Sequence, residues 1–393
     1  MIKAIHFLNS GGGGTLSVVQ NILRFSKSEE VEHHVIYTIN KAITPEFEPL
    51  NLAGAAGEQV FFYSANWNFY YTCRRLALLL PSSDAVLVAH DWLELGMASM
   101  LGLPNPVVQF LHGDFYYYYD LAAKHKNAID RFIVVSPVIE RTLKEKLVER
   151  SGDVKYCRFP VPELKSSTNS HSPLRIVYCV KNLLDERKQF QIIPAINKWL
   201  KKFDMIAEWT IVGQGIPERE LKLLMGQHEY MHCYQSLHND EVLTLLQHQD
   251  LFILPSLSEG FPVSVVEAMK GGAVPLIRNW NGATSELVRD AETGYCFQEN
   301  DPKIYAERIV YLNENREILK QMSLLAVESA KTLFEPINNT SVIENVFQEA
   351  ARDCLTGKHP QRLYGSRLDQ KWIPNMITSG IRNLAGNRKH NPI

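Results

Sequence analysis

Short apolar runs alternate with helical patterns along the whole chain, and this alternation most constrains the fold. The runs are continuous and rich in Val, Ile and Leu, which indicates strands of parallel sheets covered on both faces. Strands joined through helices build doubly wound α/β domains, which bind ligands at the carboxyl ends of their strands. The predicted strands cover residues 2–8, 34–38, 60–63, 85–89, 107–111, 132–135, 175–180, 209–212, 251–254 and 274–277.

A polar segment separates the first six predicted strands from the last four. Residues 165–173 are rich in Ser and Asn and lie near the middle of the chain, as a linker between domains would. The 393 residues are enough for two domains with complete cores. We therefore predict a first domain over residues 1–168, a second over residues 169–345, and a helical segment over residues 346–393.

Composition excludes several classes of protein. The formal net charge of -2 argues against nucleic-acid binding, which usually brings a clear excess of Lys and Arg. No apolar stretch approaches the ~20 residues that span a bilayer, and the first strand runs straight into a glycine loop, unlike a signal peptide. The six cysteines form no C-x-x-C pair, which favours buried thiols in a reducing compartment over disulfides or zinc. We predict a cytoplasmic protein.

The segment from Glu259 to Glu267 places two carboxylates around a predicted helix start. Gly260 lets the backbone approach a ligand closely, and Pro262 suits the first helical position, where no N–H is needed. The free amides there, together with the helix dipole, form an anion site. A ligand with a charged centre and hydroxyls at both ends would fit, such as a nucleotide diphosphate sugar. The alternative is a surface Glu and a helical Glu beside an ordinary turn.

This segment resembles the E-x7-E signature of retaining GT-B glycosyltransferases, in particular glycosyltransferase family 4. The resemblance implies that Glu259 contacts the hydroxyls of the donor sugar and that Glu267 holds the ribose. It places Gly260, Phe261, Pro262, Val263 and Ser264 near the diphosphate. It also implies the GT-B fold, with two Rossmann-like domains facing each other across a cleft and the last helices crossing back to the first domain.

Two features of the first domain could also contribute to a site. A glycine-rich loop over residues 9–15 follows the first strand, and such loops wrap phosphates or sugar rings with backbone amides. It lacks the Lys-Ser/Thr ending of a Walker loop, which disfavours an ATPase. The resemblance implies that Gly12, Gly13 and Gly14 meet the donor. It also assigns to His112, after the strand at 107–111, a place near the reacting carbon; His90 is a weaker candidate, and a structural role fits either histidine.

Lys181 and Lys188 flank the turn after the strand at 175–180. The family usually carries a Gly-Arg followed by a Lys here, which grip the diphosphate. In this chain Val180 and Lys181 replace the Gly and the Arg, and Lys lacks the planar fork of Arg. Lys188 is the firmer candidate for the family's Lys. Arg187 takes its place if the alignment with the family's pattern shifts by one residue. The alternative is that these residues are ordinary surface charges with no role in binding.

Two further stretches match the family's pattern in the second domain. Gly213 and Gly215 match its G-x-G turn near the nucleotide, and Glu286 lies in a stretch that resembles its G-G-x-x-E pattern. We interpret Glu286 as structural. The resemblance covers residues 175–297 well, and the first domain only through the glycine loop, the His-Gly pair and the spacing of the strands.

The resemblance implies transfer with retention at the anomeric carbon. The sequence contains no D-x-D, so we predict no metal and no cofactor; Lys188, Lys181 and the helix start would neutralise the leaving diphosphate. His112 and Glu259 complete the predicted catalytic set, although no nucleophile or general base is identified. UDP is the expected nucleotide, with GDP next.

Aromatic runs at residues 66–71 and 115–119 suit sugar stacking or a lipid interface, and we predict a glycan or lipid-linked acceptor. Basic and apolar residues alternate in the C-terminal tail, including Arg362, Arg367, Lys371 and Arg388. This mixture is typical of an amphipathic segment on the inner face of a membrane, and a terminal helix packed on the first domain explains it about as well.

Two other functions fit the same residues. A GT-B epimerase would act on the nucleotide sugar alone and would require an acid/base pair across the cleft. A non-catalytic nucleotide-sugar-binding protein would keep the pocket without the reaction, and the atypical Val180 and Lys181 leave room for it.

Overall fold

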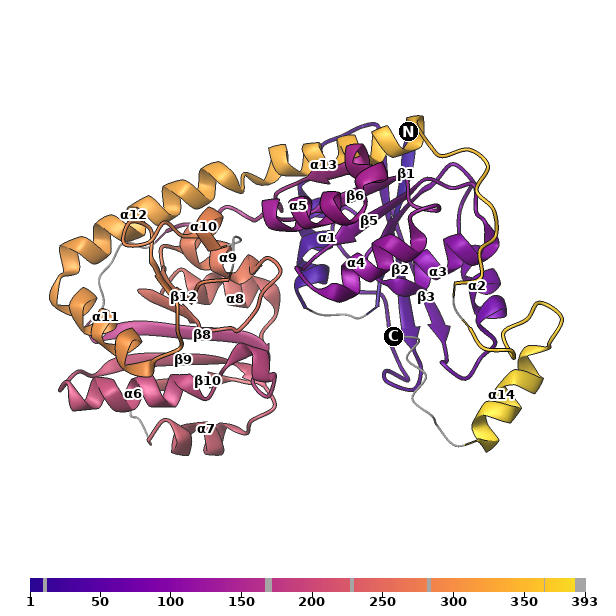
Figure 1. Cartoon of the computed structure of the whole chain (residues 1–393). Helices are drawn as coiled ribbons and strands as arrows, with labels where there is room; N and C mark the ends of the chain where they lie inside the picture. The colour runs from indigo at the N-terminus through magenta and orange to yellow at the C-terminus, as the bar shows by residue number, and fades with distance from the viewer. Residues whose placement is uncertain (10–12, 167–171, 227–229, 281–283, 364, 386–393) are drawn as a thin grey trace. The chain divides into compact units, whose positions relative to one another are not determined.

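The computed structural model describes residues 1–9, 13–166, 172–226, 230–280, 284–363 and 365–385, and it divides the chain into two compact units (Figure 1). Unit 1 comprises Met1–Pro160 together with Ile337–Ile393, and unit 2 comprises Val161–Pro336. The polypeptide therefore passes between the units twice, near residues 160 and 336. The sequence analysis placed these passages near residues 168 and 345.

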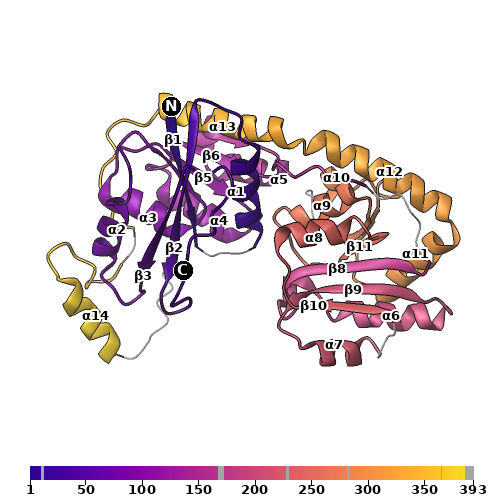
Figure 2. The same cartoon turned by 180° about the vertical axis from the view of Figure 1, so that it is seen from behind.

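Unit 1 is built on a seven-stranded parallel sheet with the order β3-β2-β1-β4-β5-β6-β7. Helices lie on both sides of this sheet (Figures 1 and 2). The strand order reverses between β1 and β4, which is the switch point of a doubly wound sheet. Its strands are β1 (Ile2–Leu8), β2 (Val31–Asn40), β3 (Gly57–Tyr63), β4 (Val86–Ala89), β5 (Val107–Leu111), β6 (Arg131–Val134) and β7 (Val154–Tyr156). Its helices are α1 (Gly14–Phe25), α2 (Phe69–Ala77), α3 (Trp92–Leu101), α4 (Tyr116–His125), α5 (Pro137–Lys146), the 3-10 helix η1 (Val148–Asp153), α13 (Pro336–Arg352) and α14 (Asn375–Leu384).

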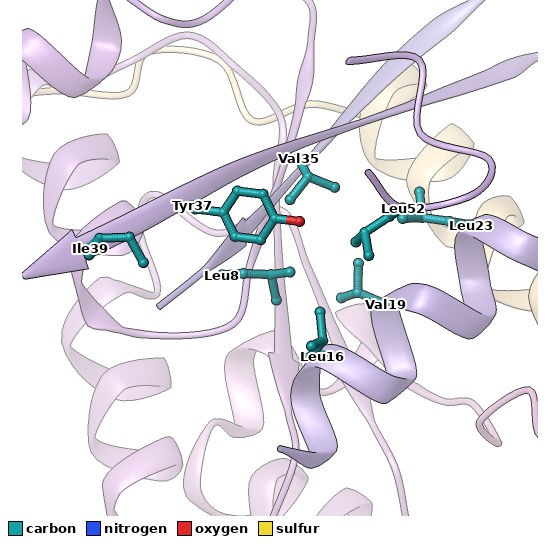
Figure 3. Packing of buried hydrophobic residues seen from close by; sticks show 8 residues of the cluster. All are labelled: Leu8, Leu16, Val19, Leu23, Val35, Tyr37, Ile39 and Leu52. Atoms are coloured by element: carbon teal, nitrogen blue, oxygen red, sulfur yellow. The ribbon is translucent and has the colours of Figure 1, made fainter. Parts of the chain in front are cut away.

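The apolar face of α1 packs on β1 and β2 (Figure 3). Leu16, Val19 and Leu23 recur at helical spacing, so they present one stripe to the sheet. Tyr37 is buried at the centre of this core, and its hydroxyl donates to Glu58 Oε2 at 2.8 Å, which satisfies the polar end of the ring. The buried residues of the cluster are Leu8, Leu16, Val19, Leu23, Val35, Tyr37, Ile39 and Leu52.

Unit 2 is built on a six-stranded parallel sheet with the order β10-β9-β8-β11-β12-β13, and its switch point lies between β8 and β11. Its strands are β8 (Leu174–Asn182), β9 (Ala207–Gln214), β10 (Met231–Tyr234), β11 (Leu251–Leu254), β12 (Val274–Arg278) and β13 (Tyr295–Phe297). Its helices are the 3-10 helix η2 (Glu186–Lys188), α6 (Ile192–Lys202), α7 (Glu218–Leu224), α8 (Asn239–Leu246), α9 (Val263–Gly271), α10 (Thr284–Leu287), α11 (Pro302–Glu314) and α12 (Arg316–Leu333).

The C-terminal segment returns to unit 1, as the predicted fold requires. In α13, Glu344 accepts a hydrogen bond from His33 of β2 at 2.9 Å. Asn68, at the start of α2, holds the segment before α14 with its side-chain amide, which donates to the carbonyls of Leu368, Gln370 and Ile373. Within the described ranges no helix combines the length and the apolar character needed to cross a bilayer.

Each of the ten predicted strands overlaps a strand of the structure. The prediction missed β7, β10 and β13, which are all edge strands of three or four residues. Edge strands are only partly buried and carry polar residues, so they lack the continuous apolar run that marks a central strand. The sequence of β10, with His232 and Cys233 between Met231 and Tyr234, is such a case.

Candidate functional site

Lys188 and Glu259 meet in unit 2, in the loops that follow the neighbouring strands β8 and β11. Lys188 Nζ donates to Glu259 Oε1 at 2.5 Å, and the side chain of Glu259 is only 12% exposed. The strand order reverses between these two strands, and a crevice at the carboxyl ends of such a pair is where doubly wound sheets bind ligands. The structure therefore brings together the two charged residues that the sequence analysis assigned to the diphosphate and the sugar.

Backbone hydrogen bonds tie the two loops together. The Leu257 amide donates to the Arg187 carbonyl at 2.7 Å, and the Tyr178 hydroxyl donates to the Lys188 carbonyl at 2.9 Å. The Arg187 guanidinium donates to Asp185 Oδ2 at 2.7 Å, and the Lys188 ammonium donates to Glu259. Lys181 is exposed to solvent at the end of β8.

Helix α9 begins at Val263, and Pro262 is its N-cap residue, with φ -79° and ψ 89°. The prediction that Pro262 occupies the first helical position was therefore wrong by one residue. The cause is a tight turn in which the Val263 amide donates back to the Phe261 carbonyl at 3.0 Å. Gly260 and Phe261 are buried and Ser264 is half-buried in this helix start.

Glu267 lies at the middle of α9, is 5% exposed, and its Oε1 atom has no hydrogen-bond partner. Burial raises the pKa of this carboxyl to about 7. The neighbouring Cys179 thiol on β8 has its pKa raised to about 12, mainly by burial and then by Glu267, so it stays protonated. Buried polar atoms in folded proteins nearly always have a hydrogen-bond partner, so this unpartnered oxygen is a candidate to meet a ligand. Glu267 is a helical Glu, as the alternative also has it, whereas Glu259, which that alternative puts on the surface, has a side chain that is only 12% exposed.

Gly213 and Gly215 sit at the end of β9, where the turn after β8 packs against them. A Cβ atom on Gly213 would lie 2.8 Å from the Val180 carbonyl oxygen, and one on Gly215 would lie 2.9 Å from Asn182 Oδ1. Gly215 also has a φ of 108°, which favours glycine. In this structure both glycines allow the turn that leads to Lys188 to lie close to the sheet.

The loop after β12 supports the loop that carries Glu259. The Trp280 indole donates to the Ser256 carbonyl at 2.7 Å, and the Thr284 hydroxyl donates to the Trp280 carbonyl at 2.9 Å. Glu286, predicted as structural, is half-buried in α10, and residues 281–283 before that helix lie outside the described residues.

Unit 1 contains the other predicted candidates. Gly13 is the N-cap of α1 with a φ of 100°, Gly14 begins that helix, and Gly12 lies outside the described residues. His112 is half-buried after β5, and burial lowers its pKa to about 3, which keeps the ring neutral. The Tyr118 ring, from the second aromatic run, meets it edge-on at 6.1 Å.

His112 is the first member of a chain of four histidines that ends on a carboxylate. His112 Nε2 lies 2.8 Å from His90 Nδ1, His90 Nε2 lies 3.4 Å from His6 Nδ1, and His6 Nε2 lies 3.0 Å from His33 Nδ1. His33 Nε2 lies 2.9 Å from Glu344 Oε1. Burial lowers the pKa of His90 and of His6 as well. The sequence analysis missed His6, a single histidine inside an apolar run, and His33, which lies between Glu32 and His34 at the polar start of β2.

The Glu344 carboxylate fixes the direction of this chain when every ring is neutral. It accepts only, so His33 carries its proton on Nε2 and accepts at Nδ1. By the same reasoning His6 and His90 each donate from Nε2 and accept at Nδ1, so the His112 proton is also on Nε2. His112 Nδ1 is then left as an acceptor. Among the described residues no group of three or more His, Cys, Asp or Glu side chains is arranged to hold a metal ion.

Comparison with known proteins adds a family and a fold. Residues 161–326 match the family model "Glycosyl transferases group 1". The chain is 26% identical over 205 residues to the N-acetyl-alpha-D-glucosaminyl L-malate synthase of Bacillus anthracis, with 52% of this chain and 53% of that protein covered. It is 32% identical over 90 residues to the N,N'-diacetylbacillosaminyl-diphospho-undecaprenol alpha-1,3-N-acetylgalactosaminyltransferase of Campylobacter jejuni, with 23% and 24% covered. The chain thus spans about half or less of the length of these relatives.

Among solved structures, Anabaena HepE in complex with UDP and glucose aligns with a TM-score of 0.70 and 14% identity, over 89% of this chain and 100% of that one. This likeness shows that the chain has the GT-B fold. The match to the family model covers most of unit 2, the unit that carries Lys188, Glu259 and Glu267. Together the matches support a glycosyltransferase of group 1.

Proposed function

We propose that the protein transfers a sugar from a nucleotide diphosphate sugar, with UDP as the nucleotide, to a glycan or lipid-linked acceptor. We further propose that transfer retains the anomeric configuration, as in family 4, and needs no metal. The observation that carries the proposal is the Lys188–Glu259 pair at the switch point of unit 2, with the buried carboxyl of Glu267 on the helix that starts beside it.

The Lys188 ammonium supplies the charge that a leaving diphosphate needs, and the dipole of α9 adds positive potential at the start of that helix. When a diphosphate binds Lys188, Glu259 loses its partner and becomes free to accept hydrogen bonds from sugar hydroxyls. The removal of one such preorganised contact typically raises a reaction barrier by ~2.7–4 kcal/mol. Lys181 is the second cation of the turn, and its exposure suits recruitment by the ligand.

UDP is favoured over GDP by the solved relatives. Anabaena HepE was solved with UDP and glucose, and the pneumococcal O-GlcNAc transferase GtfA with UDP and GlcNAc. The Campylobacter jejuni relative is named for a diphospho-undecaprenol acceptor, which supports a lipid-linked acceptor as one of the two proposed classes.

Thermal denaturation with UDP, GDP and ADP tests the proposal, with EDTA or with magnesium. A nucleotide at about a hundred times its dissociation constant adds ~2.7 kcal/mol of stability. We expect UDP alone to raise the midpoint, equally with and without metal. Lys188→Met should abolish the shift, and Lys198→Met, which removes an exposed lysine on α6, should preserve it. No shift with any nucleotide would refute the proposal, and a shift that needs magnesium would refute metal independence.

A non-catalytic nucleotide-sugar-binding protein is the second candidate, favoured by the exposed Lys181 in place of the family's arginine. Release of UDP from UDP-sugar in the presence of acceptor separates the two functions, because only the enzyme turns over. An epimerase would instead convert the donor without acceptor. Proton NMR of the product reports the anomeric configuration and tests retention directly.

We also propose peripheral contact of α14 with the inner face of an anionic membrane. Its outer side is apolar, with Leu384 91% exposed and Met376 and Ile381 exposed beside it, and Trp372 just before the helix is 73% exposed. Exposed Arg367 and Lys371 add positive charge. Flotation with phosphatidylglycerol vesicles tests this: Leu384→Ser together with Trp372→Ser should abolish binding. Binding that survives the two changes would contradict the proposal.

A further inference from the structure

Unit 1 contains a cavity of about 650 Å³ at the carboxyl ends of β1 to β4. Asn9 follows β1, Asn40 ends β2, Tyr63 ends β3 and Asp91 follows β4, and all four residues line the cavity. Ligands of open α/β sheets bind at this end, next to the switch point, which here lies between β1 and β4. The volume is in the range of ~300–1,000 Å³ that small-molecule sites have.

The C-terminal segment forms a fixed wall of this cavity. Leu363, Ser366, Asp369 and Arg382 line it. Asp369 accepts from the Phe69 amide at 2.7 Å, and the Arg382 guanidinium donates to Asp369 Oδ2 at 2.7 Å and to the Trp67 carbonyl at 2.6 Å. The cavity is therefore assembled from both parts of unit 1.

Glu94 lines the cavity and has a buried carboxyl oxygen without a partner. Its Oε1 accepts from the amides of His90 and Asp91 at 2.8 and 2.6 Å, while Oε2 is buried and makes no hydrogen bond. The residue is 2% exposed, and burial, followed by the charge of Asp91, raises its pKa to about 8. An unsatisfied buried group costs ~1–3 kcal/mol, a cost that a ligand hydroxyl would remove.

The lining combines carboxyl groups with aromatic rings. Asp91, Glu94 and Asp369 line the cavity, and among the described lining residues Arg382 is the single cation, with its guanidinium held by Asp369 and the Trp67 carbonyl. The rings of Phe69 and Trp92 stack at 5.6 Å. The Arg382 charge is offset by Asp369, and the raised pKa keeps most of the Glu94 carboxyl protonated at pH 7, so Asp91 gives this lining its net negative charge. Such a surface disfavours anions and suits a ring that has apolar faces and hydroxyl edges.

We propose that this cavity binds an uncharged sugar ring, which packs against Trp92 and hydrogen-bonds to Glu94 Oε2. The proposal rests on the proposed function in one respect: in a glycosyltransferase this sugar is the end of the acceptor. The proposal predicts that the end of the acceptor is an uncharged sugar. It also predicts that this cavity does not recognise a phosphate or a carboxylate.

Saturation-transfer NMR on the full chain tests the inference with maltotriose, cellobiose and N,N'-diacetylchitobiose, each at millimolar concentration. L-malate and glucose 6-phosphate serve as anionic comparators. Two variants address the cavity: Trp92→Ala removes a wall, and Ala65→Trp fills the space from an exposed loop position. Their matched controls are Trp199→Ala, on α6 of unit 2, and Ala53→Trp, at an exposed position of unit 1, and neither residue lines the cavity. UDP-induced thermal stabilisation is measured on every variant.

We expect at least one neutral oligosaccharide to bind, both cavity variants to weaken it at least tenfold, and both controls to leave it unchanged. UDP stabilisation should be the same in all five proteins, which also shows that the variants are folded. The inference would be overturned if an anion bound in preference to the saccharides, or if the cavity variants bound saccharide as well as the wild type does. It would also be overturned if no saccharide bound to a protein that UDP stabilises. Saccharide binding without UDP stabilisation would instead uphold the cavity and refute the proposed donor site.

Discussion

Nucleotide-sugar binding should release a proton from Glu267. In the free protein this carboxyl is buried, Oε1 has no partner, and its pKa is raised to about 7. Ribose hydroxyls that donate to the carboxyl favour its charged form and therefore lower that pKa. If the pKa falls below its ordinary value in the complex, about half a proton leaves per binding event at pH 7, and about a tenth of a proton at pH 8.

The same residue should limit the stability of the free protein. A pKa raised from 4.5 to about 7 means that stability is fully present below pH 4.5 and falls as the pH rises through 7. The loss is about 3 kcal/mol, at 1.36 kcal/mol per pKa unit. Glu267→Gln removes this dependence, so the variant should gain stability relative to the wild type between pH 5 and pH 8 while it loses nucleotide affinity.

Isothermal titration calorimetry with UDP-glucose in phosphate and in Tris measures the released proton, because the two buffers differ in their heats of ionisation. UDP-glucose is a diphosphate diester with no ionisation near neutral pH, so it adds no proton of its own. The buffer dependence should be present in the wild type and absent in Glu267→Gln. Equal heats in both buffers for the wild type at pH 7, or a buffer dependence that persists in the variant, would refute the assignment.

Three further predictions follow from named contacts. Lys270 is fully buried, and its ammonium donates to Glu163 at 2.6 Å and to the carbonyls of Val161 and Phe334 at 2.7 and 2.9 Å. Lys270→Met should cost ~2–5 kcal/mol in urea denaturation because two buried carbonyls lose their donor, whereas Lys222→Met, which removes an exposed ion pair, should leave the urea midpoint nearly unchanged. Glu344→Gln should change which ring nitrogen of each histidine in the chain carries the proton, because the amide can donate as well as accept. The imidazole ¹⁵N shifts of His112 should therefore change, although three histidines of the chain lie between Glu344 and His112. Unchanged shifts would disprove a single ordered chain. Gly213→Ala should weaken UDP binding at least tenfold by displacing the turn before Lys188, and Gly380→Ala, where a Cβ meets nothing within 4 Å, is the control.

The sequence contained most of the proposed donor site because its residues lie in short contiguous segments. Glu259 and Glu267 belong to one strand–loop–helix unit, and Lys188 follows the neighbouring strand, so the parallel topology alone brings them to one edge of the sheet. Details that depend on tertiary contact were less accessible. Pro262 was misplaced by one residue, and the packing role of Gly213 appears only when the turn after β8 is in place.

The site in unit 1 could not be read in the same way, because its parts are distant in the sequence. Asp91 and Glu94 form a capping box, and this spacing after a strand was a signal available in the sequence. The wall that encloses them comes from residues 363–382, whose basic and apolar composition suggested a membrane helix or a packed terminus. Arg382 shows why composition was ambiguous: it belongs to the basic set of the tail, yet its charge is held by Asp369 inside the unit. Among the described residues of this segment, the exposed ones of α14 and of the turn before it, with Lys371 and Trp372 among them, are available for the proposed membrane contact, so the segment can form the cavity wall with one side and offer a surface with the other.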